Sequence, residues 1–264
     1  MSILLYPIKY SLLAVTALLS VFISASVSAQ HADIWLVLNA NQTAVSATNL
    51  ETTSQVKLDF ASRKFLFTGD FSDVGQGPTG TDDPGFQAEP GTFNSGAILN
   101  FRAVGSLQFW DGSDWGNTPV DQERFQIEDA LSNITTIDSS GVANAEGAID
   151  QIASDGSVHQ HVDFSIDNSL GGGTVAPGAY MIELEFYSTN GVGGSIVHTL
   201  SESVLIVHNY QLSNSEFDAA ILQLTEPESV SVPIPGGLLF FFAGLLAIIA
   251  GKARSSNTQL KEIS

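Results

Sequence analysis

The sequence predicts a mainly β protein, an Ig-like β-sandwich of about two hundred residues that lies between two hydrophobic ends. Three observations favour this class. Alternating or apolar runs bounded by Gly, Asn, Asp and Ser recur through the middle of the chain, which is typical of strands and turns. A single stretch near the end of that region has helical spacing. A region of this length also suffices for one β domain with its own core.

Hydrophobicity divides the chain into consecutive segments. At the front, Lys9 precedes an apolar stretch that ends in Val27-Ser-Ala29, with small residues where signal peptidase cuts. The predicted organisation is a signal peptide at 1–29, a β-sandwich ectodomain at 30–225, a polar linker at 226–232, a transmembrane sorting segment at 233–251 and a cytoplasmic basic and polar tail at 252–264.

The carboxyl-terminal run predicts a single membrane helix. No side chain from Pro233 to Gly251 carries a charge, and an apolar helix needs roughly 20 residues to cross a bilayer. Lys252 and Arg254 follow as a basic stop, which places the end of the chain in the cytoplasm. The ectodomain is therefore expected outside the cytoplasm.

The head of this run carries a resemblance. Val232, Pro233 and Pro235, followed by the membrane helix and the basic residues, resemble the PEP-CTERM sorting signal of Gram-negative bacteria, although Ile234 stands where that family usually has glutamate. The resemblance implies anchoring in the inner membrane, recognition by an exosortase-type sorting enzyme, and release to the cell surface or the extracellular matrix. An ordinary single-span anchor is the alternative interpretation.

The expected strands share alternating or continuous apolar residues and cover 33–38, 55–60, 64–68, 97–104, 106–110, 124–127, 158–166, 179–187 and 196–207. Residues 69–96 are rich in Gly, Pro and Asp and are expected to form a long ordered loop, with a second polar insertion at 138–156.

A capping-box sequence predicts the one helix. Ser213-Asn-Ser-Glu216 has the serine and the glutamate at the spacing of this motif, and Phe217, Ala220, Ile221 and Leu224 follow at helical spacing. A short amphipathic helix is therefore expected to close the ectodomain.

Charge and cysteine content exclude several classes of function. Residues 30–230 hold 27 acidic and five basic residues, so the net charge of this region is about −22. Such a domain repels nucleic acid. Cysteine is absent, which excludes disulfides, thiolate metal ligands and a cysteine nucleophile.

The segment Val158-His-Gln-His-Val-Asp-Phe-Ser-Ile166 contains the strongest candidate site. With a period of two, Val158 and Val162 share an apolar face, whereas His159, His161 and Asp163 share the other. Histidines two apart on a strand lie about 7 Å apart at their backbones, so both imidazoles can converge on one ion.

The start of the mature chain adds further ligands. His31 and Asp33 share a polar face opposite Ile34 and Leu36. If the two strands are neighbours, His31, His159 and His161 supply three nitrogens, with Asp33 or Asp163 as fourth ligand or supporting carboxylate. Zinc fits this set first, and copper or nickel can use similar ligands. The alternative is a solvated histidine pair without an ion.

A second resemblance concerns the ectodomain itself. It is carried by His31-Ala-Asp-Ile-Trp35, Thr81-Asp-Asp-Pro-Gly-Phe86, Leu107-Gln-Phe-Trp-Asp-Gly112, His159-Gln-His161, Ala176-Pro-Gly-Ala-Tyr180 and Val207-His-Asn-Tyr-Gln-Leu-Ser213. These motifs resemble a family of PEP-CTERM proteins thought to be controlled by the zinc-uptake repressor. The histidine strand followed by Pro-Gly-x-Tyr is also similar to surface-anchored repeats that accompany metal transporters. The resemblance implies a role when zinc is scarce, with a metal-uptake system as a partner.

The sequence favours a binding protein over an enzyme. No Gly-x-Ser-x-Gly elbow or phosphate-cradling glycine motif appears, so hydrolase and nucleotide chemistry have no support. The remaining alternative is a structural or adhesive protein of the extracellular matrix or biofilm, whose acidic surface meets exopolysaccharide and which has no metal site.

Overall fold

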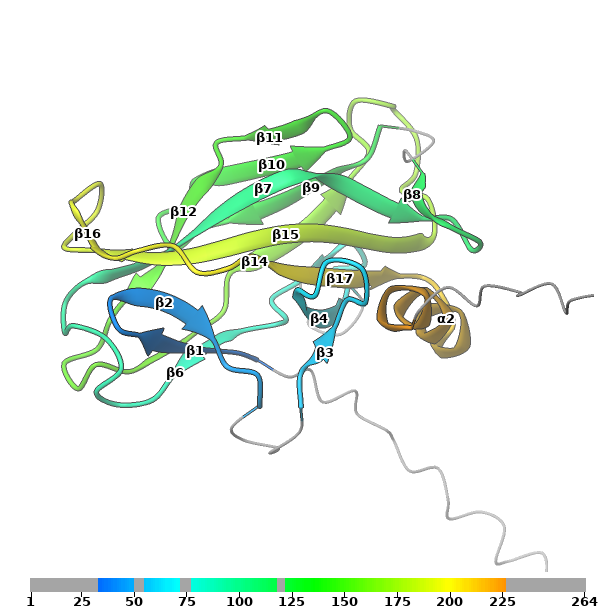
Figure 1. Cartoon of the computed structure of the whole chain (residues 1–264). Helices are drawn as coiled ribbons and strands as arrows, with labels where there is room; N and C mark the ends of the chain where they lie inside the picture. The colour runs from blue at the N-terminus through cyan, green and yellow to red at the C-terminus, as the bar shows by residue number, and fades with distance from the viewer. Residues whose placement is uncertain (1–32, 50–54, 72–76, 118–121, 227–264) are drawn as a thin grey trace, which may run out of the picture. The chain divides into compact units, whose positions relative to one another are not determined.

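The computed structural model describes residues 33–49, 55–71, 77–117 and 122–226. These residues form a mainly β structure with several sheets and one α-helix, which confirms the predicted class at that level (Figure 1). The predicted signal peptide, sorting motif, membrane segment and basic stop lie outside the described residues. Among the residues that are described, no helix is long and apolar enough to cross a membrane.

The largest element is an eight-stranded sheet, called the large sheet below. Its order is β12 (Glu146–Gln151), β7 (Ile98–Trp110), β15 (Gly178–Thr189), β17 (Val204–Tyr210), β4 (Phe65–Asp70) and β3 (Lys57–Leu58), with β16 (Ile196–His198) paired to β15 and β8 (Trp115–Asn117) paired to β7. Most pairs are antiparallel, but β17 and β4 are parallel.

Two smaller sheets complete the β structure. The four-stranded sheet has the order β13 (Val158–Gln160), β6 (Phe86–Ala88), β1 (Ile34–Asn39) and β2 (Gln42–Val45). The five-stranded sheet has the order β11 (Gly141–Ala143), β10 (Ile134–Asp138), β9 (Arg124–Glu128), β14 (Asp163–Asp167) and β5 (Gly80–Thr81).

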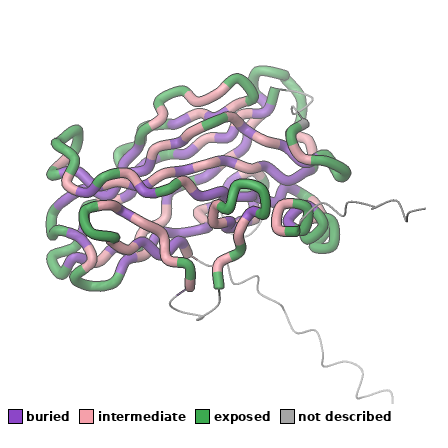
Figure 2. The backbone as a smooth tube through the Cα atoms, viewed as in Figure 1, coloured by how far each residue is buried: buried purple, intermediate pink, exposed green. Residues whose placement is uncertain are grey.

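The main core lies between the large sheet and the two smaller sheets, where the buried backbone is purple in Figure 2. The ring of Phe86 in the four-stranded sheet lies 5.5 Å from that of Phe186 in the large sheet. Phe125 and Phe164 of the five-stranded sheet pack against His208 of β17. Every residue of β17 is buried, because the sheet is covered on its other face as well.

The helix α2 (Asn214–Thr225) provides that second cover and confirms the predicted capping box. Ser213 accepts a hydrogen bond from the Glu216 backbone, and the Glu216 side chain accepts one from the Ser213 backbone. Ala220 and Ile221 pack with Leu205 and other buried residues of the large sheet. The Trp115 indole donates to the Ala220 carbonyl over 2.8 Å, which fixes the helix to the start of β8.

Several predicted strand boundaries are wrong. Residues 196–207, expected as one strand, contain β16 and the start of β17, which are separate strands. Residues 97–104 and 106–110 form the single strand β7, which continues through Gly105 at a φ of 76° and is bulged there against β15. Residues 158–166 instead form two strands, β13 and β14, in different sheets, because β13 pairs with β6 whereas β14 pairs with β9 and β5.

The two segments predicted as a loop and a polar insertion also contain strands. Residues 69–96 contribute β5 and β6, and residues 138–156 contribute β11 and β12. β5, β6 and β11 have only two or three residues each, so their local composition does not reveal pairing that is decided by neighbours distant in sequence.

A buried carboxylate organises the turn after β9. Asp129 accepts hydrogen bonds from the backbone amides of Leu131, Asn133 and Ala148 over 2.8, 2.7 and 3.0 Å. Burial alone would raise the pKa of Asp129, but the hydrogen bonds from Asn133, Ala148 and Leu131 outweigh it and hold the pKa below its ordinary value. The charged form is therefore the one that the fold stabilises.

We expect Asp129→Ala to lower the free energy of unfolding at pH 7 by about 2 to 3 kcal/mol, because several amides lose a charged acceptor. Since the folded pKa is depressed, this stability is present above the unfolded pKa of about 3.9 and is lost as the pH falls through the folded value. Urea unfolding at pH 7 and in steps below pH 4 measures the effect. The control is Asp155→Ala in an exposed turn. An equal loss of unfolding free energy in both variants would contradict a special stabilising role for the buried Asp129.

Candidate metal centre

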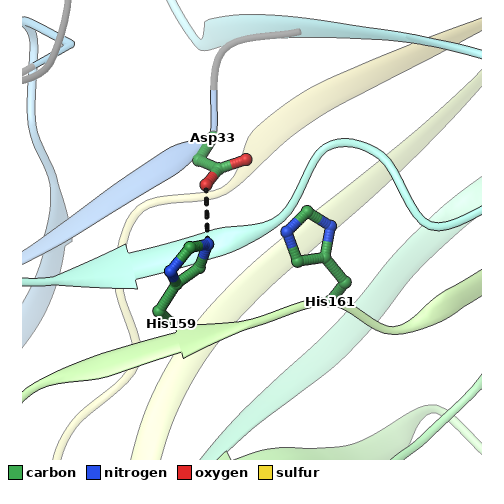
Figure 3. Close-up of side chains that lie close together, drawn as sticks. All are labelled: Asp33, His159 and His161. Atoms are coloured by element: carbon green, nitrogen blue, oxygen red, sulfur yellow. Dashed lines mark ion pairs between the residues drawn. The ribbon is translucent and has the colours of Figure 1, made fainter.

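The four-stranded sheet brings together a carboxylate and two imidazoles from distant parts of the chain. Gln87 on β6 is the register partner of Trp35 on β1 and of His159 on β13, so β6 runs between the two ligand-bearing strands. Asp33 immediately precedes β1, and His161 immediately follows β13. Figure 3 shows the Asp33 carboxylate and the His159 ring facing each other, with the His161 ring beside them.

The distances suit a single small cation. One ligand atom from each of Asp33, His159 and His161 can be chosen so that all three lie within 4.8 Å of one another. The Nε2 atom of His159 lies 3.6 Å from Oδ2 of Asp33. Two ligand atoms on one tetrahedral zinc ion lie about 3.3 Å apart, since each is about 2.0 to 2.1 Å from the metal. The spacing of 3.6 Å between Asp33 and His159 is close to that value.

Burial decreases from the carboxylate outward. The side chains of Asp33, His161 and His159 are 11%, 32% and 66% exposed. The Asp33 carboxylate is thus the most enclosed of the three ligands, and His159 lies on the side of the site that is open to solvent. An ion held by these three groups keeps at least one position for a further ligand.

Neutral donors hold the Asp33 carboxylate. The Gln87 side-chain amide donates to Oδ2, and the Gly85 backbone amide donates to Oδ1 over 3.2 Å. The Ile34 amide also donates to the Gly85 carbonyl over 2.8 Å, which ties the loop before β6 to the start of β1. The negative charge is oriented without being neutralised by these donors, so a cation at the site is favoured.

The tautomer of His161 leaves one nitrogen available to a metal. Its Nδ1 lies 2.8 Å from the Asp82 carbonyl oxygen, which only accepts, so Nδ1 carries the proton and Nε2 presents a lone pair. This arrangement, with one ring nitrogen fixed by a carbonyl, is usual for metal-binding histidines. A second cluster of ligand atoms consists of Asp82, Asp83 and His161. Because Nδ1 of His161 carries a proton, this second cluster positions the His161 ring for the first cluster and does not itself bind the metal through Nδ1.

Gly85 is required by the close approach of the two ligands. A Cβ atom at this position would lie 2.6 Å from Cε1 and Nε2 of His161 and 2.9 Å from Oδ1 of Asp33. These distances are shorter than any real Cβ contact, so the lack of a side chain is what lets the imidazole and the carboxylate meet.

Three of the predicted ligands meet in the described part of the chain, and Asp163 lies apart from them. His31 lies outside the described residues, two positions before Asp33. Asp163 is exposed on β14 of the five-stranded sheet, opposite Glu128, and is not part of either ligand cluster among the described residues. The alternation placed Asp163 with the histidines only if 158–166 were one strand, and the chain changes sheets after His161.

Sequence patterns did not identify the supporting residues. Gln87 acts through an amide, Gly85 through its missing side chain and Asp82 through its carbonyl. The usable signal is the run Thr81-Asp-Asp-Pro-Gly-Phe86, whose composition predicts only part of a long loop. Backbone contributions of this kind leave no side-chain pattern in a sequence.

Comparison with known protein families, with curated proteins and with solved structures finds no match to this chain.

Proposed function

We propose that this chain is an exported surface protein that reversibly binds a divalent transition metal, zinc in the first place, through Asp33, His159 and His161. The observation that carries the proposal is the convergence of these three ligand atoms within 4.8 Å, from two segments more than a hundred residues apart. Two imidazoles and one carboxylate are a set that zinc accepts, and copper or nickel compete for it.

The open side of the site suits capture and release. His31, in the segment just before Asp33, supplies a third nitrogen, or water fills the position. The strongly acidic ectodomain raises the local concentration of cations. In this role the protein holds zinc outside the cytoplasm or passes it to an uptake system.

The proposed location rests on the two hydrophobic ends. The front segment directs export, and the run from Pro233 to Gly251 anchors the chain in the inner membrane until an exosortase-type enzyme releases it to the surface or matrix. We propose an Ig-like strand arrangement for the ectodomain, because many cell-surface domains have this sandwich architecture. Fractionation of the cells tests the location: recovery of the uncut chain in the cytosol alone would contradict it.

Calorimetric titration of the full chain in detergent with zinc tests the binding. We expect one ion per chain, and zinc at about 100 times its dissociation constant should stabilise the fold by about 2.7 kcal/mol. The double variant His159→Ala, His161→Ala should lose both effects. A wild-type chain that takes up no zinc, nickel or copper would reject the proposal and favour the matrix protein without a metal site.

A further inference from the structure

His208 lies fully buried on β17, at the centre of the large sheet, and is distinct from the metal ligands. Its ring centroid lies 5.0 Å from the rings of Phe71, Phe125 and Phe164. Its Nε2 lies 2.9 Å from the Asp83 carbonyl oxygen, so Nε2 carries a proton and donates to that oxygen. A histidine in an aromatic cage therefore directs its Nε2 at the loop before β6.

That loop, residues 82–85, touches two of the three metal ligands. The Asp82 carbonyl accepts from Nδ1 of His161 over 2.8 Å, and the Gly85 amide donates to Oδ1 of Asp33 over 3.2 Å. The Asp83 carboxylate lies 3.5 Å from the same Nδ1. The position of the loop thus sets where the imidazole and the carboxylate meet.

The contact between His208 and the loop needs a second glycine. A Cβ atom on Gly69 would lie 2.6 Å from the Asp83 oxygen and 2.7 Å from Cδ2 of the His208 ring. Gly69 is the register partner of His208 in the parallel pair of β17 and β4. The middle of the large sheet is therefore shaped to admit the Asp83 carbonyl against the buried ring.

We propose that His208 is a positioning residue for the metal site: it fixes the loop 82–85 through the Asp83 carbonyl, and the loop fixes His161 and Asp33. The inference rests on the proposed zinc site, and it adds that His208 and the loop 82–85 hold the ligands of that site in place. Neither His208 nor Gly69 touches the ion. Supporting groups behind metal ligands typically contribute 10-fold to 100-fold in affinity.

Two substitutions at His208 separate positioning from packing. His208→Phe keeps an aromatic ring and removes the donor, whereas His208→Gln places an amide nitrogen where Nε2 lies. In the full chain in detergent, at a temperature where each variant is folded by circular dichroism, we expect His208→Phe to bind zinc about 10-fold to 100-fold more weakly and His208→Gln to stay close to wild type. The visible spectrum of bound cobalt should change in the first variant only.

Further variants complete the test. Gly69→Ala pushes the Asp83 carbonyl away from the ring and should reproduce the loss, including when His208→Phe does not fold. Phe101→Leu, at a fully buried position on β7, should lower stability and leave affinity unchanged. The inference is overturned, and the proposed function is not, if folded His208→Phe or Gly69→Ala binds zinc with wild-type affinity. The same holds if Phe101→Leu loses as much affinity as these variants. A wild-type chain that binds no metal overturns the proposed function and this inference together.

Discussion

Replacing Asp33 by asparagine is expected to weaken zinc binding at least about 100-fold, equivalent to about 2.7 kcal/mol, because the most buried of the three ligands loses its charge and one of its oxygens. The side chain keeps its size, but its single oxygen replaces two separate acceptors, so the hydrogen bond from either Gly85 or Gln87 is lost as well. Titration calorimetry at constant pH measures the change.

Asp163→Asn is the matched control for this variant. It removes the same charge from the other carboxylate near the histidines in sequence, but Asp163 lies on β14 in a different sheet. Its affinity for zinc should equal that of the wild type. Equal losses in the two variants would mean that general acidity attracts the metal, and a loss in Asp163→Asn alone would reject the assigned ligands.

Replacing Gly85 by alanine is expected to weaken zinc binding strongly although no ligand is removed. The added methyl group lies within 2.9 Å of both His161 and Asp33, so the two must separate. We expect affinity to fall about 10-fold to 100-fold and the free energy of unfolding to fall by about 1 to 3 kcal/mol from overpacking. Titration calorimetry with zinc measures the affinity. Urea unfolding in the absence of zinc measures the free energy of unfolding separately.

Gly147→Ala provides the same steric conflict away from the site. Its Cβ would lie 2.4 Å from Phe101 and 3.0 Å from Cβ of Asp129. This variant should lose stability and keep the zinc affinity of the wild type. If Gly147→Ala also loses zinc, the effect of Gly85→Ala reports general strain and the close approach at Gly85 is not what forms the site.

The mainly β class, the helix and its cap were predictable because each depends on nearby residues. Ser213 and Glu216 lie three positions apart and satisfy each other's backbone, so the capping box needs no tertiary context. The alternation around Val158 and His159 likewise fixes which side chains face the core.

The sheet assignment of residues 158–166 was not predictable from that alternation. Val158, Val162, Phe164 and Ile166 are all buried, as expected from a period of two. A period of two continues through a change of sheet, however, because both strands face the same core. Whether Asp163 joins His161 depends on pairing with β9, more than thirty residues earlier, which no local pattern encodes.

The candidate site was predictable in its ligands and not in its framework. Histidines two apart and an aspartate at the start of a strand are visible in the sequence. The strand β6 between them, with Gly85 and Gln87, is short and follows a run of Asp, Pro and Gly that is typical of turns. Long-range pairing of β6 with β1 and β13 is what converts these separate signals into one site.

Crystals of the protein grown with zinc, with diffraction recorded on both sides of the zinc absorption edge, test the central claim most directly. We expect one strong anomalous peak within about 2.0 to 2.2 Å of Nε2 of His161, a nitrogen of His159 and an oxygen of Asp33. A fully folded chain with no peak at this place, or with its zinc bound only at other residues, would contradict the account.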